Sequence, residues 1–250
     1  KYLAVKATAN HAGLVGIDDF KLLASDIKVE FNNVKQPGAV GNAPVVNFSV
    51  MPGGGYTFPG GNGDLKIDHA SKVLRASVAI AELQIDSYVF VRGALAFEKG
   101  DELGVTLSNG SKLTQVPSTN IGGEGLTMFL GINGPYRTDL DGDGVTDELP
   151  NEDAVGLALT NADFAVSLLK PTTSAIKTKY IALKASADEF GFVGTDVFEV
   201  EASNIKVELN LAKGTGTNEA TPVVDFAVDN PSERLALFDS DDADTVGMIT

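Results

Sequence analysis

The sequence predicts an all-β protein with an elongated architecture built from repeats. Apolar and polar residues alternate with a period of two in several segments of the 250 residues, and Ser, Asn and Asp stand where the alternation breaks. No segment carries the 3.6-residue periodicity of an amphipathic helix. This pattern fits a β-solenoid-like stack of rungs and an extended β-sandwich equally well, so both architectures stay open.

An internal repeat organises the chain. Residues 1–50 align with residues 179–228 at a constant offset of 178 with no gap, and 25 of the 50 aligned positions are identical. We therefore divide the chain into a first repeat unit, residues 1–178, and the start of a second unit, residues 179–250. This organisation predicts a segment of a longer tandem array.

A shorter rhythm runs inside the unit. Residues 157–168, 181–193 and 198–209 each contain two alternating stretches around a short polar break, which predicts short strands joined at tight corners. The predicted corners are Thr160-Asn161, Ala185-Ser186 and Ala202 to Asn204. The same alternation predicts that Ile27, Val29, Ile205 and Val207 are buried and that Lys28, Glu30, Lys206 and Glu208 are exposed.

Other segments show where strands and loops lie. Residues 73–97 are rich in Val and Ile and predict two or three strands. A helix over Leu74–Leu83 is the alternative, because alanines are frequent there. Residues 51–63 and 116–125 are rich in Gly and Pro and predict long loops.

Composition excludes several classes of function. The chain has 19 Lys and Arg against 34 Asp and Glu, for a formal net charge of −15, so nucleic acid and anionic membrane surfaces are unsuitable partners. It has no cysteine, which excludes disulfides, thiol nucleophiles and Cys-ligated metals. No apolar run approaches the 18 or so residues of a membrane-spanning helix.

One motif carries specific chemistry. Residues 139–147 read DLDGDGVTD, in which three Asp alternate, a Gly follows the third, and a fourth Asp comes four residues later. Calcium takes six to eight oxygen ligands, and alternating Asp in a tight coil can supply them. The predicted ligands are the side chains of Asp139, Asp141, Asp143 and Asp147 and the carbonyl oxygen of Val145.

This calcium loop, near residues 139–153, departs from an EF-hand. Pro150 stands where an EF-hand has its bidentate Glu, and no flanking helices are evident. Glu148, Glu152 or Asp153 could complete the ligand set from the returning chain. The alternative interpretation is a solvated acidic turn, although four Asp within nine residues repel one another in the absence of a cation.

Catalytic patterns are weak, and we expect no enzymatic activity. The two histidines, His11 and His69, lie in no nucleophile motif, and Glu189 replaces His11 in the second copy of the repeat. Five aromatic residues could form a surface for stacking against sugars, although ordinary packing between strands explains them as well. They are Tyr56, Phe58, Tyr88, Phe90 and Tyr136.

The repeat, the strand-pair segment FKLLASDIKVEFN (residues 20–32) and the segment Gly134–Leu168 resemble the repeat regions of very large bacterial secreted or cell-surface proteins. This group includes calcium-dependent RTX-type adhesins and surface-layer-like proteins. The resemblance implies an extracellular or cell-surface location, rigidity that depends on calcium, and a structural role in adhesion or in building a fibre or sheath. A carbohydrate- or ligand-binding module of such a protein is the alternative.

The resemblance also bears on partners. It implies contacts with neighbouring repeats of the same protein or with identical chains, and surface polysaccharide is a further candidate. We expect end-to-end contacts through residues 1–30 and 200–228, favoured by calcium, because divalent cations relieve the repulsion between acidic chains.

Overall fold

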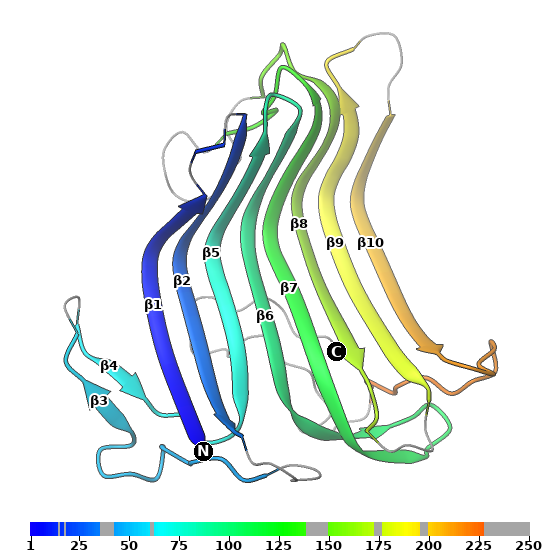
Figure 1. Cartoon of the computed structure of the whole chain (residues 1–250). Helices are drawn as coiled ribbons and strands as arrows, with labels where there is room; N and C mark the ends of the chain where they lie inside the picture. Colours follow the sequence, from blue (N-terminus) through cyan, green and yellow to red (C-terminus); the bar gives the residue numbers. More distant parts are fainter. Residues whose placement is uncertain are drawn as a thin grey trace.

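The protein is built around one wide antiparallel sheet of eight long strands, in the order β1-β2-β5-β6-β7-β8-β9-β10 (Figure 1). The computed structural model describes residues 1–14, 16–17, 19–35, 43–60, 63–138, 150–172, 177–195 and 200–227. The strands are β1 (Tyr2–Leu14), β2 (Phe20–Val34), β5 (Val73–Ile85), β6 (Val89–Thr106), β7 (Lys112–Ile132), β8 (Val155–Leu169), β9 (Lys179–Val193) and β10 (Val200–Lys213). A separate hairpin pairs β3 (Tyr56–Phe58) with β4 (Leu65–Ile67).

The all-β class predicted from the sequence is confirmed, and the segment 73–97 contributes two strands, as expected. Each strand of the large sheet pairs antiparallel with the next one along the chain, except that β2 passes over the β3–β4 hairpin to reach β5. Among the described strands we find neither stacked solenoid rungs nor a second large sheet packed face to face. The observed architecture is a broad sheet whose strands bend part-way along their length (Figure 1).

The predicted corners do not end strands. Thr160-Asn161, Ala185-Ser186 and Ala202 to Asn204 all lie inside single long strands, β8, β9 and β10. Asn161 and Asn204 have φ of 48° and 53°, and ladder pairs continue on both sides of them. Asn and Asp tolerate this left-handed conformation, so a polar residue can bend a paired strand as well as terminate it.

These left-handed residues form a row across the middle of the sheet, which we call the bend row. It contains Asp26 in β2, Gly93 in β6, Gly125 in β7, Asn161 in β8 and Asn204 in β10. The prediction of a loop at 116–125 is wrong for the same reason, because its glycines and Pro117 lie inside β7, where the register with β6 and β8 shifts.

The first and last hairpins of the sheet share one register. Tyr2 pairs with Val34 and Ala9 with Ile27 in β1–β2, while Tyr180 pairs with Ala212 and Ala187 with Ile205 in β9–β10. Each ladder pair of β1–β2 equals a pair of β9–β10 after a shift of 178. Two long-range side-chain contacts repeat as well, because the Asn32 amide donates to the carbonyl of Val46 and the Asn210 amide donates to that of Val224.

The predicted alternation of burial along these hairpins is wrong for most of its residues, while Lys206 and Glu208 are exposed, as expected. Ile27 and Val29 are half-buried, and so are their neighbours Lys28 and Glu30. Val207 is 47% exposed. Alternation with polar residues does not by itself bury an apolar residue in this sheet. Long stretches of β1, β2 and β10 have no second layer of described residues over them.

Burial is concentrated in three places. One cluster forms at the end of the sheet where Leu107, Val116, Leu169, Tyr180 and Val224 meet. A second lies at the bend row, and a third lies at the opposite end around Phe129, Ala154 and Ala158. In the first cluster, residues 221–227 fold back over the sheet, and we call this segment the strap; its equivalent in the first repeat is residues 43–49.

The two equivalent tyrosines show how uneven this burial is. Tyr180 is 4% exposed and packs in the first cluster, and burial raises the pKa of its hydroxyl. Its equivalent Tyr2, on the edge strand β1, is 60% exposed.

We predict that Tyr180→Ala destabilises the protein by about 3 kcal/mol or more, since it removes a buried aromatic ring and leaves a cavity. Tyr2→Ala at the equivalent position should change the free energy of unfolding by no more than about 0.5 kcal/mol. Chemical denaturation of both variants tests this difference, and equal losses would contradict the described burial.

We also predict that Gly93→Ala costs about 1–3 kcal/mol. Gly93 has φ of 151°, and a Cβ there would lie 2.8 Å from Leu126 Cδ2 and 3.0 Å from the carbonyl oxygen of Glu124. Gly104→Ala in the same strand is the control, because the nearest atom to its Cβ would be 4.0 Å away. Thermal unfolding of the two variants should separate them, and an unaffected Gly93→Ala protein would refute the bend at this position.

Candidate functional site

The predicted calcium ligands Asp139, Asp141, Asp143, Val145 and Asp147 all lie outside the described residues. The chain on either side of them is described. Residues 133–138 follow β7 and residues 150–154 precede β8, and we call these two segments together the neck.

Two asparagines hold the neck closed. The side-chain amide of Asn151 donates to the carbonyl oxygens of Asn133 at 2.8 Å and Pro135 at 3.2 Å. In return, the side-chain amide of Asn133 donates to the carbonyl oxygen of Asp153 at 3.0 Å. The backbone amide of Asn151 also donates to the carbonyl oxygen of Tyr136 at 2.8 Å. The outgoing and returning chains are therefore tied together from both sides.

The base of the neck rests on the third buried cluster. Ala154 is fully buried against Phe129 and Ala158, and Tyr136, Phe90 and Val193 pack against the same group. Two of the acids that could complete a calcium site from the returning chain, Glu152 and Asp153, are described and are exposed on the neck. Among the described residues, no three acidic or histidine side chains come close enough to hold a metal ion by themselves.

A groove of about 290 Å³ lies beside the neck. Its lining includes Phe90 and Phe129, whose ring centroids are 6.3 Å apart, and Tyr136 with the Arg137 guanidinium 5.6 Å from its ring centroid. Glu82 and Arg92 add charges of both signs. The groove can therefore hold a small ligand with an apolar face and polar groups at its edge.

The five aromatic residues considered as a sugar-stacking surface do not gather in one place. Phe90 and Tyr136 line the groove, and Tyr88 lies in the turn just before β6. Tyr56 and Phe58 lie against each other in β3 with their rings tilted by 52° and their centroids 4.6 Å apart. Figure 1 places β3 at the other end of the sheet from the start of β6.

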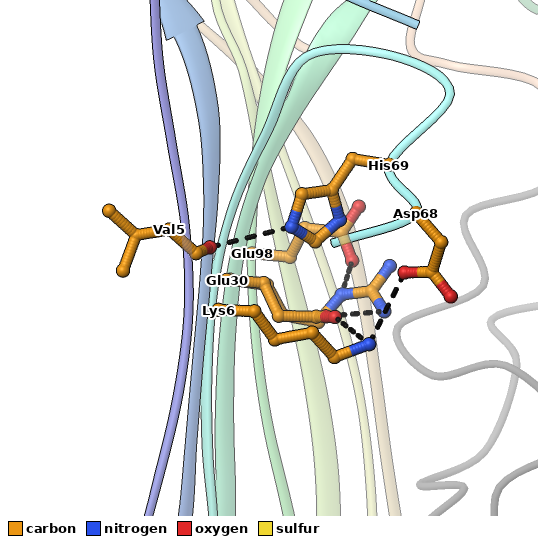
Figure 2. A network of polar contacts seen from close by, with 7 residues as sticks. Val5, Lys6, Glu30, Asp68, His69 and Glu98 are labelled. Carbon is orange, nitrogen blue, oxygen red and sulfur yellow. Dashed lines mark hydrogen bonds and ion pairs between the residues drawn. The ribbon is translucent and has the colours of Figure 1, made fainter. Parts of the chain in front are cut away.

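A row of alternating charges crosses four strands and was not anticipated from the sequence (Figure 2). Lys6 in β1 pairs with Glu30 in β2 at 3.4 Å, and Arg75 in β5 bonds to Glu30 at 3.4 Å and to Glu98 in β6 at 3.0 Å. These residues are direct ladder partners, so the alternation of charge follows the register. Each strand carries one of these charges in the sequence. The alternation of sign between neighbouring strands can be recognised only when the register is known.

The chain from β3 to His69, which we call the β3–β4 segment, contacts this row through two residues that follow β4. Asp68 accepts a bond from Lys6 at 3.3 Å, and His69 Nε2 lies 3.4 Å from the carbonyl oxygen of Val5 (Figure 2). Every charged group here is partly exposed, so each pair contributes no more than about 1 kcal/mol. The row aligns strands and attaches the β3–β4 segment to β1.

The two histidines have different neighbours, since His11 lies beside a serine hydroxyl and His69 beside a backbone carbonyl oxygen. His11 Nδ1 lies 3.0 Å from the Ser25 hydroxyl oxygen in the exposed β1–β2 hairpin. Ser203 keeps the serine in the second copy, but Glu189 stands in place of the histidine. The second copy of the repeat therefore keeps the serine of the His11–Ser25 pair and not the histidine.

Comparison with family models, with curated proteins and with solved structures gives no match to this chain. The described part contains no helix of the length and apolarity needed to cross a membrane. The fold and site thus define an antiparallel β-sheet protein in which two asparagines join the segments on either side of residues 139–149.

We predict that Asn151→Ala lowers the free energy of unfolding by about 1–3 kcal/mol, because it removes several hydrogen bonds that join the two sides of the neck. Asn109→Ala is the control, since the Asn109 side chain bonds only to Ser111 two residues away. Calcium-free thermal unfolding and amide exchange at residues 133–138 and 150–154 measure the effect. Faster exchange in the control than in Asn151→Ala would contradict the role given to the neck.

Proposed function

We propose that this chain is a calcium-stabilised structural segment of a large extracellular surface protein, with a role in adhesion or in building a fibre or sheath. The observation that carries the proposal is the closed neck. The two described segments that flank residues 139–147, with their four Asp in nine residues, are held together by Asn133 and Asn151.

The neck makes calcium binding physically favourable. Closing a loop costs conformational entropy. The hydrogen bonds of the neck hold the two ends of this segment together before any ion binds, so the ion need not offset that part of the entropy. Four nearby carboxylates repel one another, and a divalent cation removes that repulsion while gaining oxygen ligands. Glu152 and Asp153 are exposed on the neck and can add ligands from the returning chain.

The rest of the proposal follows from charge and composition. A net charge of −15 without any cysteine suits a chain that works outside the cell at millimolar calcium. Neighbouring repeats of the same protein, or identical chains, are the proposed partners, and the proposal includes no catalytic role. The tandem organisation into units of 178 residues is part of it.

The groove beside the neck favours a second candidate, a carbohydrate- or ligand-binding module. Phe90 and Tyr136 offer aromatic rings there, and Glu82 offers a carboxylate for hydroxyl groups. This candidate is compatible with the first, because the groove and the calcium loop share the neck.

We predict that calcium raises the melting temperature of the chain. At a calcium concentration of about 100 times the Kd, binding adds about 2.7 kcal/mol to the folded state. For a chain of this size that corresponds to a rise of about 5–10 °C. Scanning calorimetry with calcium, with magnesium and with a chelator measures the gain and its selectivity.

Two double variants make this test specific. Asp141→Ala with Asp143→Ala should abolish the gain, because it removes two ligands from the loop. Glu189→Ala with Glu201→Ala removes the same charge from exposed positions in β9 and β10 and should keep the gain. Identical melting curves of the native chain with calcium and with chelator would refute the proposal.

A further inference from the structure

The edge strand β1 has a counterpart that is not at an edge. Among the described strands β1 pairs only with β2, whereas β9, its equivalent in the second copy, pairs with both β10 and β8. The β9 strand thus shows which neighbour pairs with such a strand on the side where β1 has no described partner.

The two strands present the same backbone to a neighbour. Ladder pairs in β1–β2 and β9–β10 coincide after the shift of 178, and the left-handed residues Asp26 and Asn204 coincide as well. An antiparallel partner reads backbone groups at fixed spacing, so a strand that fits β9 also fits β1.

Side-chain burial differs between the two strands in the way that a missing neighbour would produce. Tyr180, Ala182 and Ala187 are buried in β9. Their equivalents Tyr2 and Ala9 are exposed, and Ala4 is half-buried. Tyr180 is paired directly with Leu169 of β8, and the described residues contain no counterpart of Leu169 beside Tyr2.

The strap shows the same difference. Val224 is 3% exposed because the turn between β6 and β7 closes over it: Leu107 forms a bridge with Val224, and the amide of Ser108 donates to the carbonyl of Val223 at 2.8 Å. The equivalent Val46 is held by Asn32 in the same way that Asn210 holds Val224, yet it is only half-buried. Among the described residues, no turn covers residues 43–49 in the way that the β6–β7 turn covers the strap.

The β3–β4 segment does not occupy this edge as a paired strand. It approaches β1 near Val5 and Lys6, and it forms no ladder with any strand of the large sheet. In the other half of β1, residues 8–14 are all exposed.

We propose that the open edge of β1 binds a β8-type strand from a preceding repeat unit, in the register that β8 has with β9. Shifting that register by 178 pairs Ala162 with Ala9, Leu159 with Ala12, and Leu157 with Leu14. In this register Asp163 would stand opposite Thr8, which places it diagonal to Lys6 and within reach of that long side chain. The inference rests on the proposed function, since it names the partner that a tandem surface protein would place at this edge.

Cysteine cross-linking tests the partner and the register together, because the chain has no cysteine of its own. The full chain is made as Ala9→Cys and as Ala12→Cys, both at exposed positions. Each is mixed with synthetic peptides of residues 155–169 that carry cysteine at position 159 or at position 162, in a glutathione redox buffer with a chelator. Directly opposed residues in adjacent strands are close enough for a disulfide. Circular dichroism checks that both variants keep the native sheet.

We expect the matched combinations, Ala12→Cys with cysteine at 159 and Ala9→Cys with cysteine at 162, to cross-link about tenfold faster than the crossed ones, since pairing raises the local concentration of the correct thiol. A peptide of residues 73–85 with one central cysteine should react no faster than the crossed combinations, because its counterpart β5 pairs with β2 and not with β1.

Equal rates in all combinations, or faster reaction of the 73–85 peptide, would overturn the inference. Disulfide dimers of the full chain that form in preference to the peptide adduct would also overturn it, in favour of an identical chain at this edge. The calcium experiment stands apart from these outcomes. A calcium-dependent melting shift without register-specific cross-linking removes only the edge partner, while cross-linking without the melting shift removes only the calcium role.

Discussion

The backbone hydrogen-bond ladder is the interaction on which this structure depends. Eight long strands lie side by side, and most of their side chains are half-buried or exposed on both faces of the sheet. A protein with so little fully buried apolar surface gains less from the hydrophobic effect than a compact domain of equal length. Its strands are held by pairing along their whole length and by cross-strand contacts such as the charge row from Lys6 to Glu98.

The three buried clusters add side-chain packing to the ladder at the two ends of the sheet and at the bend row. The strap and the turn between β6 and β7 cover one end of the sheet, the neck covers the other, and Leu126, Ala162 and Ala187 pack at the bend row. The chain on either side of residues 139–147 is therefore anchored at a reinforced end of the sheet, where β7 and β8 are joined.

The sequence was sufficient for the class of fold, the two strands of residues 73–97 and the equivalence of the first and last hairpins. It was insufficient for strand length, because Asn161 and Asn204 carry the composition of a turn while serving as bends inside paired strands. It was insufficient for burial too, because alternation says which residues share a face and not whether anything covers that face. The neck depends on side-chain amides reaching backbone carbonyls across eighteen residues, from Asn133 to Asn151, and no local pattern announces such a contact.

The spacing of equivalent strands has a consequence for the shape of any larger assembly. From β1 to β9 there are six steps across the sheet, which at about 4.8 Å per step is an advance of about 29 Å for 178 residues. The strands themselves, of 13 to 21 residues, run about 44–71 Å along the perpendicular direction. In the proposed tandem array each unit would thus be broader than the distance it adds, so the array would cover area and would lengthen only slowly.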